Sequence, residues 1–322
     1  MPSAGKGSIH LFRVAGIDVF MHWSWFVVAA IEIGVREGRY SSYVWSALEY
    51  LALFVIVLLH EFGHAFACRQ VGGTANRIML WPLGGVAFVD PPQRPGAMLW
   101  SLAAGPLVNV ALAPFLYAAM LAAGALGWQQ TIPDAYHLTF WVFWIDVILL
   151  VFNLLPVYPL DGGQILRSLL WFVLGRGRSL VAATVMGFVG AAGFVLLALW
   201  EHSVWLVIIA AYLLLNCWGG LKHALALIKL ERVPRREGFA CPSCHSKPPL
   251  GAYWRCAQCN SAFDTFATGA VCPFCGARFA TTMCLDCQRT SSIEAWAGAQ
   301  HGVVDGEPAM QSAFSSTDMS KR

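Results

Sequence analysis

Six apolar runs of near-membrane length occupy the first 230 residues, and they constrain the fold more than any other feature. An α-helix needs about 20 predominantly apolar residues to cross a bilayer. Only 12% of the residues are charged, whereas soluble domains average about 25%. We therefore predict a mainly α, polytopic membrane protein with about six transmembrane helices. The expected spans lie near residues 21–35, 47–68, 97–126, 138–155, 180–200 and 203–228.

The composition changes at about residue 230, where the chain becomes polar and rich in Cys, Pro and Gly. We predict a membrane domain at residues 1–232, a Cys-rich domain at 233–290 and a disordered tail at 291–322. The N-terminus lacks a short apolar core followed by a small-residue cleavage site. The first span should therefore stay in the mature protein.

The positive charges of the membrane region predict its orientation, because Lys and Arg are retained on the cytoplasmic side. With the N-terminus inside, thirteen of these residues fall on the cytoplasmic side and only Arg36 and Arg39 fall outside. We expect a multi-pass integral membrane protein with both termini in the cytoplasm.

Ionisable residues follow directly after an apolar run in the sequence LALFVIVLLHEFGH, residues 51–64. Residues four apart share a helix face, so His60 and His64 can bind one zinc ion while Glu61 points toward a water on that ion. A catalytic zinc usually has three protein ligands. Asp161 is the candidate third ligand, because it follows two prolines that interrupt an apolar run, and intramembrane carboxylates need a partner. The alternative is a chance motif whose histidines cap a helix end.

Four motifs together resemble the site-2 protease family of intramembrane zinc metalloproteases. The motifs are HEFGH at 60–64, WPLGG at 81–85, AAGPLVN at 103–109 and NLLPVYPLDGG at 153–163. The resemblance implies zinc ligands His60, His64 and Asp161, with Glu61 as the catalytic acid and base. It also implies that Asn153 helps to hold the substrate or the oxyanion.

The function that this resemblance implies is hydrolysis of a peptide bond within or near a transmembrane helix of a membrane-anchored protein, with release to the cytosol. One alternative is a membrane zinc transporter or sensor that uses the same three ligands. Another is an inactive protease-like scaffold. Glu61 favours the protease, because a transport path has no need for a base beside the metal-bound water.

The segment RIMLWPLGGVAFVD, residues 77–90, alternates apolar residues around a Pro-Leu-Gly-Gly sequence. This pattern predicts a short β-hairpin or re-entrant loop. We expect its edge, at Gly84, Gly85 and Val86, to add a strand to an unwound substrate. A simple membrane-embedded turn is the alternative.

Three polar or small residues inside the predicted spans are less informative. Gly105 indicates close helix packing, and Asp146 indicates a structural hydrogen bond inside the bundle. For Asn109, packing and support of the site remain equally open.

Eight cysteines form four Cys-x-x-Cys pairs, which predict two structural zinc sites in a double zinc ribbon. We pair the first with the second and the third with the fourth, because short loops close at lower entropic cost; a crossed arrangement stays open. With the intramembrane site, this gives one catalytic and two structural Zn²⁺ ions. Residues 238–322 contain six basic and six acidic residues, so a protein partner is favoured over nucleic acid. The expected structural ligands are Cys241, Cys244, Cys256, Cys259, Cys272, Cys275, Cys284 and Cys287.

Overall fold

The computed structural model describes residues 7–35, 39–81 and 84–301. The chain divides into two compact units, Met1–Glu231 and Arg232–Arg322.

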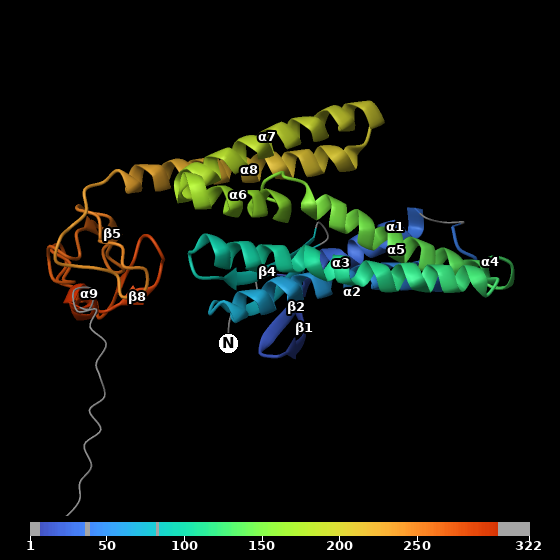
Figure 1. Ribbon diagram of the computed structural model, residues 1–322, viewed down its shortest axis with the longest axis horizontal. Helices are drawn as coiled ribbons and strands as arrows, with labels where there is room; N and C mark the ends of the chain where they lie inside the picture. Colours follow the sequence, from blue (N-terminus) through green and yellow to red (C-terminus); the bar gives the residue numbers. More distant parts are fainter. Residues whose placement is uncertain (1–6, 36–38, 82–83, 302–322) are drawn as a thin grey trace, which may run out of the picture. The chain divides into compact units, whose positions relative to one another are not determined.

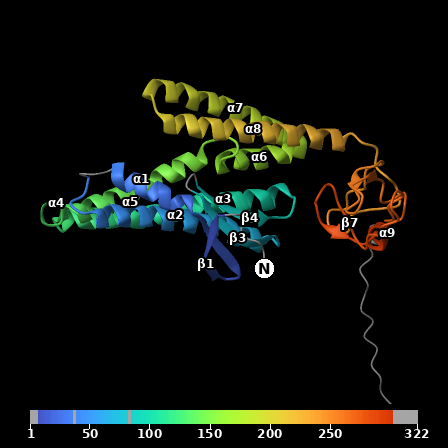
Figure 2. The ribbon, with the colours of Figure 1, turned by 180° about the vertical axis from the view of Figure 1, so that it is seen from behind.

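Five helices in the described part of the first unit are long and apolar enough to cross a membrane. The predicted fold class is therefore confirmed, with one span fewer than expected. Helices α7 and α8 lie side by side in both ribbon views (Figures 1 and 2). The five helices are α2 (Tyr43–Gln70), α3 (Pro95–Ala125), α5 (Pro133–Leu154), α7 (Arg176–Glu201) and α8 (Val204–Glu231).

The span predicted at residues 21–35 is wrong in extent. Its first residues complete strand β2 (Ile17–His22), and helix α1 covers only Ser24–Val35. Twelve helical residues rise about 18 Å, well short of the roughly 30 Å of a hydrocarbon core. Apolar β2 and α1 are adjacent in the chain, so together they look like one hydrophobic run.

The hairpin predicted at residues 77–90 is confirmed, and its two antiparallel strands belong to a four-stranded sheet. Its order is β1–β2–β3–β4, with β1 (Ser8–Val14), β3 (Thr74–Trp81) and β4 (Gly84–Asp90) completing the set. Strand β2 runs parallel to β3, and β4 forms an edge of the sheet. Alternate apolar residues of β2 and β3 pack in one core with helix α2. The link between β3 and β4, at residues 82–83, lies outside the described residues.

An irregular connection separates α5 from the short helix α6 (Asp161–Leu174). The connection contains Pro156 and Pro159, and the Tyr158–Pro159 peptide is cis. A side chain at Gly162 or Gly163 would collide with the backbone of the preceding connection. This close packing places Asp161 at the very start of α6. A single-turn helix, α4 (Trp128–Thr131), precedes α5.

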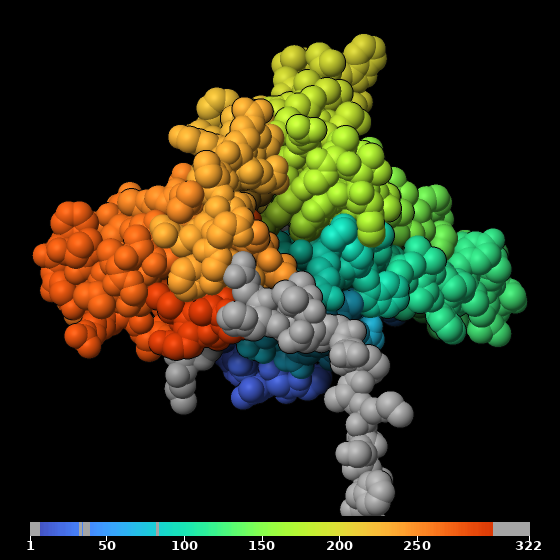
Figure 3. Space-filling model, turned by 60° about the vertical axis from the view of Figure 1, so that its left-hand side comes forward, coloured from blue at the N-terminus to red at the C-terminus, as the bar shows by residue number. Residues whose placement is uncertain are grey.

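The second unit is built from short hairpins and loops, and residues 232–301 gather into a compact body that is orange to red in Figure 3. Strand β5 (Trp254–Arg255) pairs with β6 (Ala262–Phe263), and β7 (Thr282–Met283) pairs with β8 (Thr290–Ser291). Four aromatic residues, Trp254, Phe263, Phe266 and Trp296, form its buried core together with cysteines.

The tail predicted at residues 291–322 begins too early. Helix α9 covers Ile293–His301, and its Trp296 side chain is only 1% exposed. The Trp296 carbonyl also accepts a hydrogen bond from the Ala240 backbone. A single aromatic anchor gives little periodicity in the sequence, which is why the helix was missed. The remainder of the predicted tail, residues 302–322, lies outside the described residues.

The contact between α2 and α3 depends on Gly63. A Cβ atom at this position would lie 2.7 Å from the Ala104 carbonyl oxygen and 2.8 Å from a Val108 methyl group. Overpacking of this kind typically costs about 1–3 kcal/mol. We expect Gly63→Val to lower the unfolding temperature of the purified protein. Gly193→Val is the matched control, because nothing lies within 4 Å of that glycine in α7; equal destabilisation by both variants would contradict this account of the contact.

Candidate metal centres

Three potential metal ligands from two helices meet inside the first unit. His60 and His64 lie one turn apart on α2, and Asp161 begins α6. The Asp161 Oδ2 atom lies 3.0 Å from His60 Nε2 and 3.2 Å from His64 Nε2. The two Nε2 atoms are 3.1 Å apart. Both imidazoles are buried, with 5% and 7% exposure, so water does not surround this group.

The other nitrogen of each imidazole has an oxygen partner. His64 Nδ1 donates to the Ser101 backbone carbonyl at 2.8 Å, and His60 Nδ1 donates to the Asn109 side-chain carbonyl at 2.6 Å. Because each neutral ring carries one proton, both Nε2 atoms are left with lone pairs. Two lone pairs and a carboxylate oxygen therefore face one another across about 3 Å. The two lone pairs and the carboxylate oxygen repel one another unless a cation lies between them.

The donor set and the available space fit Zn²⁺. Imidazole nitrogen and carboxylate oxygen bind zinc at about 2.0–2.2 Å, so tetrahedral ligands lie roughly 3.3 Å apart. The ligand distances here come within a few tenths of an ångström of that value. Gly105 on α3 completes the cradle, because a Cβ atom there would collide with His64 and would lie 2.7 Å from His60 Nε2. Three protein ligands leave a fourth position for water or substrate, as in catalytic zinc sites.

Glu61 lies beside these ligands without joining them. Its Oε2 atom accepts a hydrogen bond from the Ala87 backbone N–H of strand β4 at 2.8 Å. A Cβ atom on the neighbouring Gly85 would lie 2.5 Å from the Glu61 carboxyl carbon. Strand β4 therefore needs a glycine at this point, and it holds the Glu61 carboxylate next to the candidate metal ligands.

A cavity of about 360 Å³ is lined by His60, Asp161 and Glu61. Asn153, near the end of α5, lines it together with Gly84 and Gly85. Val86 instead lines an adjoining, mainly apolar cavity that also includes both glycines. Most of the predicted site residues of the first unit thus line two adjoining spaces. Apolar side chains form much of the remaining wall of the first cavity, including Leu53, Val57, Leu149, Phe152, Ile209 and Leu213.

The sequence favoured helix packing at Gly105, and at Asn109 it left packing and support of the site equally open. We interpreted Gly105 as a packing residue, whereas it faces both imidazoles, and Asn109 holds His60. The four-residue spacing puts the two on one face of α3, as with the two histidines of α2. That shared face was the available signal, but the sequence does not show which helix it meets.

The second unit brings its eight cysteines into two groups of four. The first pair of the sequence joins the last, and the two central pairs join each other, so the sequential pairing that we predicted is wrong. Loop entropy depends only weakly on loop length. Packing of the shared aromatic core therefore outweighs the difference in loop entropy. It brings the first and last cysteine pairs together and leaves the two central pairs to form a group of their own. The groups are Cys241, Cys244, Cys284 and Cys287, and Cys256, Cys259, Cys272 and Cys275.

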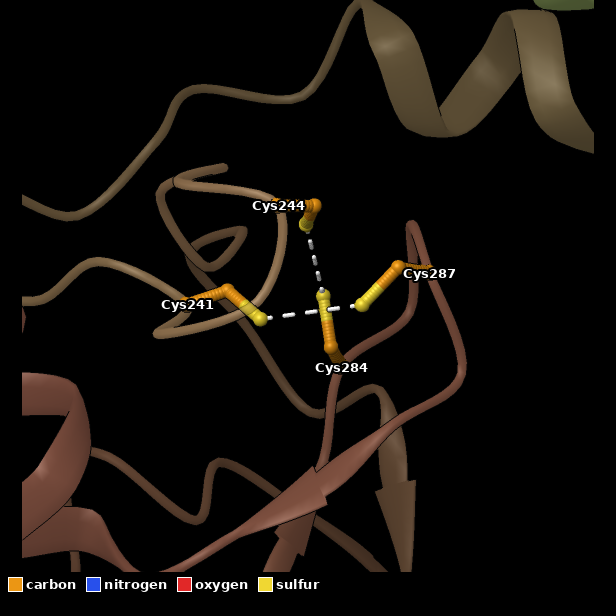
Figure 4. A group of neighbouring side chains, drawn as sticks. All are labelled: Cys241, Cys244, Cys284 and Cys287. Atoms are coloured by element: carbon orange, nitrogen blue, oxygen red, sulfur yellow. Dashed lines mark hydrogen bonds between the residues drawn. The ribbon is translucent and has the colours of Figure 1, made fainter. Parts of the chain in front are cut away.

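The outer group has four sulfur atoms turned toward one centre (Figure 4). The Sγ atoms of Cys241 and Cys287 are 3.6 Å apart, and those of Cys244 and Cys284 are 3.7 Å apart. The hydrogen bond from Cys284 lowers the pKa of the Cys244 thiol to about 4, and the shared proton raises the pKa of Cys284. Four sulfurs at this spacing fit a closed, structural zinc site.

The fold and the buried His–His–Asp group define an integral membrane protein with a metal site between its helices. Residues 49–134 and 129–197 match the model of peptidase family M50. The zinc metalloprotease MJ0392 of Methanocaldococcus jannaschii is 30% identical over 226 residues, which cover 70% of this chain and 63% of that protein. The stage IV sporulation protein FB of Bacillus subtilis is 34% identical over 152 residues, covering 47% and 46% of the two chains.

The membrane unit of this chain is therefore similar to peptidase family M50 and to zinc metalloproteases. The chain spans less than two thirds of the length of these relatives. Among solved structures, the site-2 protease from Methanocaldococcus jannaschii aligns with a TM-score of 0.47 and 27% identity. That alignment covers 66% of this chain and 95% of the solved one.

The second unit should depend on metal for its fold, because its aromatic core is small and its cysteines form two four-sulfur groups. We expect a strong chelator to make the purified full chain sensitive to protease within residues 232–301, and added Zn²⁺ to restore resistance. Limited proteolysis with mass spectrometry of the fragments measures this. The membrane helices of the same sample provide the internal control, and unchanged resistance after complete metal removal would argue against structural metal.

Proposed function

We propose that this chain is an intramembrane zinc metalloprotease that cuts a membrane-anchored protein within or near its transmembrane helix. The observation that carries the proposal is the meeting of two buried imidazoles, His60 and His64, with the Asp161 carboxylate, with Glu61 beside them. The match to a peptidase family over residues 49–134 and 129–197 supports the reaction class. Zinc metalloproteases use this combination of three ligands and one free carboxylate.

His60, His64 and Asp161 would hold the zinc ion, which lowers the pKa of water to about 7 and polarises the scissile carbonyl. Glu61 would accept the proton of the attacking water and later return it to the leaving amine. The Ala87 N–H bond holds one Glu61 oxygen, which leaves the other free for this transfer. Asn153 faces the same cavity and would donate a hydrogen bond to the substrate carbonyl as negative charge develops there.

Strand β4 would hold the substrate in an extended form. A helical peptide hides its carbonyls in hydrogen bonds, so it must unwind before it is cut. Strand β4 is the last strand of the sheet, so one of its two edges is not paired with another strand. The Ala87 N–H lies on this unpaired edge, because it points to Glu61 and not to β3. In an antiparallel ladder alternate residues face outward, so Gly85 shares this direction. A substrate strand added at Gly85 and Val86 would run past the metal ligands.

The remaining parts of the proposal concern placement and metal content. The charge bias of the sequence favours cytoplasmic termini, which would put the cut near the cytoplasmic face and release the product there. We propose three zinc ions for each chain, one at the His–His–Asp site and two in the cysteine groups. The second unit would bind a protein partner. A zinc transporter is the weaker candidate, because the apolar run at residues 51–59 offers no further ligands along α2.

Replacing Glu61 with glutamine should abolish cleavage and leave zinc bound, because Glu61 is not a ligand. General acid–base groups contribute about 10²–10⁴-fold to rate, so we expect a loss of at least that size. Quantitative proteomics of single-span membrane proteins in expressing cells would measure cleavage, and elemental analysis would measure zinc. Glu49→Gln is the control, since Glu49 is also buried in α2 but bonds to Tyr40 and Arg39. Normal cleavage by Glu61→Gln would refute its assigned role.

A photo-crosslinking residue at Val86 should capture the substrate whose cleavage is lost in Glu61→Gln. The Val86 side chain is 46% exposed. Val14, which is 47% exposed on edge strand β1, is the matched control at the other side of the sheet. Crosslinks at Val86 alone support strand addition, whereas equal crosslinking at both positions or none at Val86 would favour a simple turn.

A further inference from the structure

We infer that Asp146 is a positioning residue for the metal site, acting on His60 through Asn109. The inference rests on the proposed function, since it concerns the orientation of a zinc ligand. Asp146 lies on α5, Asn109 on α3 and His60 on α2. Three helices are thus joined by two consecutive side-chain hydrogen bonds that end at the metal ligand.

The two hydrogen bonds are short and fully buried. Asn109 Nδ2 donates to Asp146 Oδ1 at 2.7 Å, and Asn109 Oδ1 accepts from His60 Nδ1 at 2.6 Å. Asn109 is 1% exposed and Asp146 is 0% exposed. The second carboxyl oxygen of Asp146 has no hydrogen-bond partner among the described residues. Asn109 is therefore the side chain on which Asp146 acts in this part of the chain.

Asp146 fixes which end of the Asn109 amide faces His60. An asparagine side chain can turn by 180° and exchange its donor and acceptor ends. In the turned state the NH₂ group would face His60 Nδ1, so the ring proton would have to move to Nε2, the atom that faces Asp161. A carboxylate accepts hydrogen bonds and cannot donate them. It therefore selects the orientation in which His60 keeps its Nε2 lone pair for the metal.

His64 shows why only one of the two histidines needs such an arrangement. Its Nδ1 atom donates to the backbone carbonyl of Ser101, which cannot exchange ends and is always an acceptor. The tautomer of His64 is fixed by that one contact. The partner of His60 is the Asn109 side-chain amide, which can exchange its donor and acceptor ends. The tautomer of His60 is therefore fixed only if a further residue fixes the orientation of that amide. Asp146 is that residue, at a position seven residues before Asn153 on the same helix.

Metal affinity tests the relay, because changes to residues that orient a zinc ligand typically weaken binding about 10–100-fold. The probe is Co²⁺, titrated into the metal-free full chain and followed by its visible absorption. Subtracting the titration of Asp161→Ala, which lacks one ligand, isolates the intramembrane site from the cysteine groups. We expect Asn109→Leu and Asp146→Leu each to weaken Co²⁺ binding about 10–100-fold and to change the shape of the spectrum.

The double variant distinguishes a relay from a general loss of packing. If Asp146 acts through Asn109, Asp146→Leu has no further effect on Co²⁺ affinity in the Asn109→Leu background. Asp146→Asn should weaken binding less than Asp146→Leu, because its amide oxygen can still accept from Asn109. Should the leucine variant fail to fold, this near-isosteric change carries the same comparison in both backgrounds. Thr184→Val is the control, since Thr184 is equally buried but bonds only within α7.

Wild-type affinity in both Asp146 variants, or additive losses in the double variant, would overturn the relay. A wild-type chain without Asp161-dependent Co²⁺ absorption would instead refute the proposed function itself. Failure of the relay and failure of the proposed function therefore give different results in the same Co²⁺ titrations.

Discussion

The membrane unit is organised around three electron-pair donors that face one another across about 3 Å in a buried space. Without a cation, the two imidazole lone pairs and the carboxylate would repel each other where water cannot screen them. Bringing the three donors together requires α2 to meet the start of α6. It also requires α3 to approach closely enough that only glycine fits at position 105. The meeting of these three donors therefore requires a fixed spacing of three helices.

The break between α5 and α6 follows from the same requirement. A continuous membrane helix would bury an unpaired Asp161 among apolar side chains, which is costly. The irregular connection before α6 turns the chain so that Asp161 meets the histidines instead. Strand β4 approaches from the sheet side and holds Glu61 through the Ala87 N–H group. One site is thus assembled from an unbroken helix, an interrupted helix and a sheet edge, and each contributes something that the others lack.

The second unit combines a small hydrophobic core with candidate metal ligands. Its buried aromatic core is small, and its two cysteine groups are nested along the chain. The outer group connects the beginning of the unit with its end, so metal binding there would constrain the whole intervening chain. Trp296 of α9 packs into the same core from a segment that we expected to be disordered. Hydrophobic and metal contacts consequently act on the same loops.

The sequence alone was sufficient for the membrane class and for five of the spans, and it singled out the three side chains that meet in the structure. Each of these depends on local spacing: apolar length for the spans, the helical repeat for His60 and His64, and an isolated intramembrane carboxylate for Asp161. The strands before α1, the nesting of the cysteine pairs and the support of His60 by Asn109 and Asp146 could not be read in this way. These features depend on which distant segments become neighbours, and neighbour choice is decided by packing of the whole chain. Local patterns identified the chemical groups, and the tertiary structure decided which of them meet.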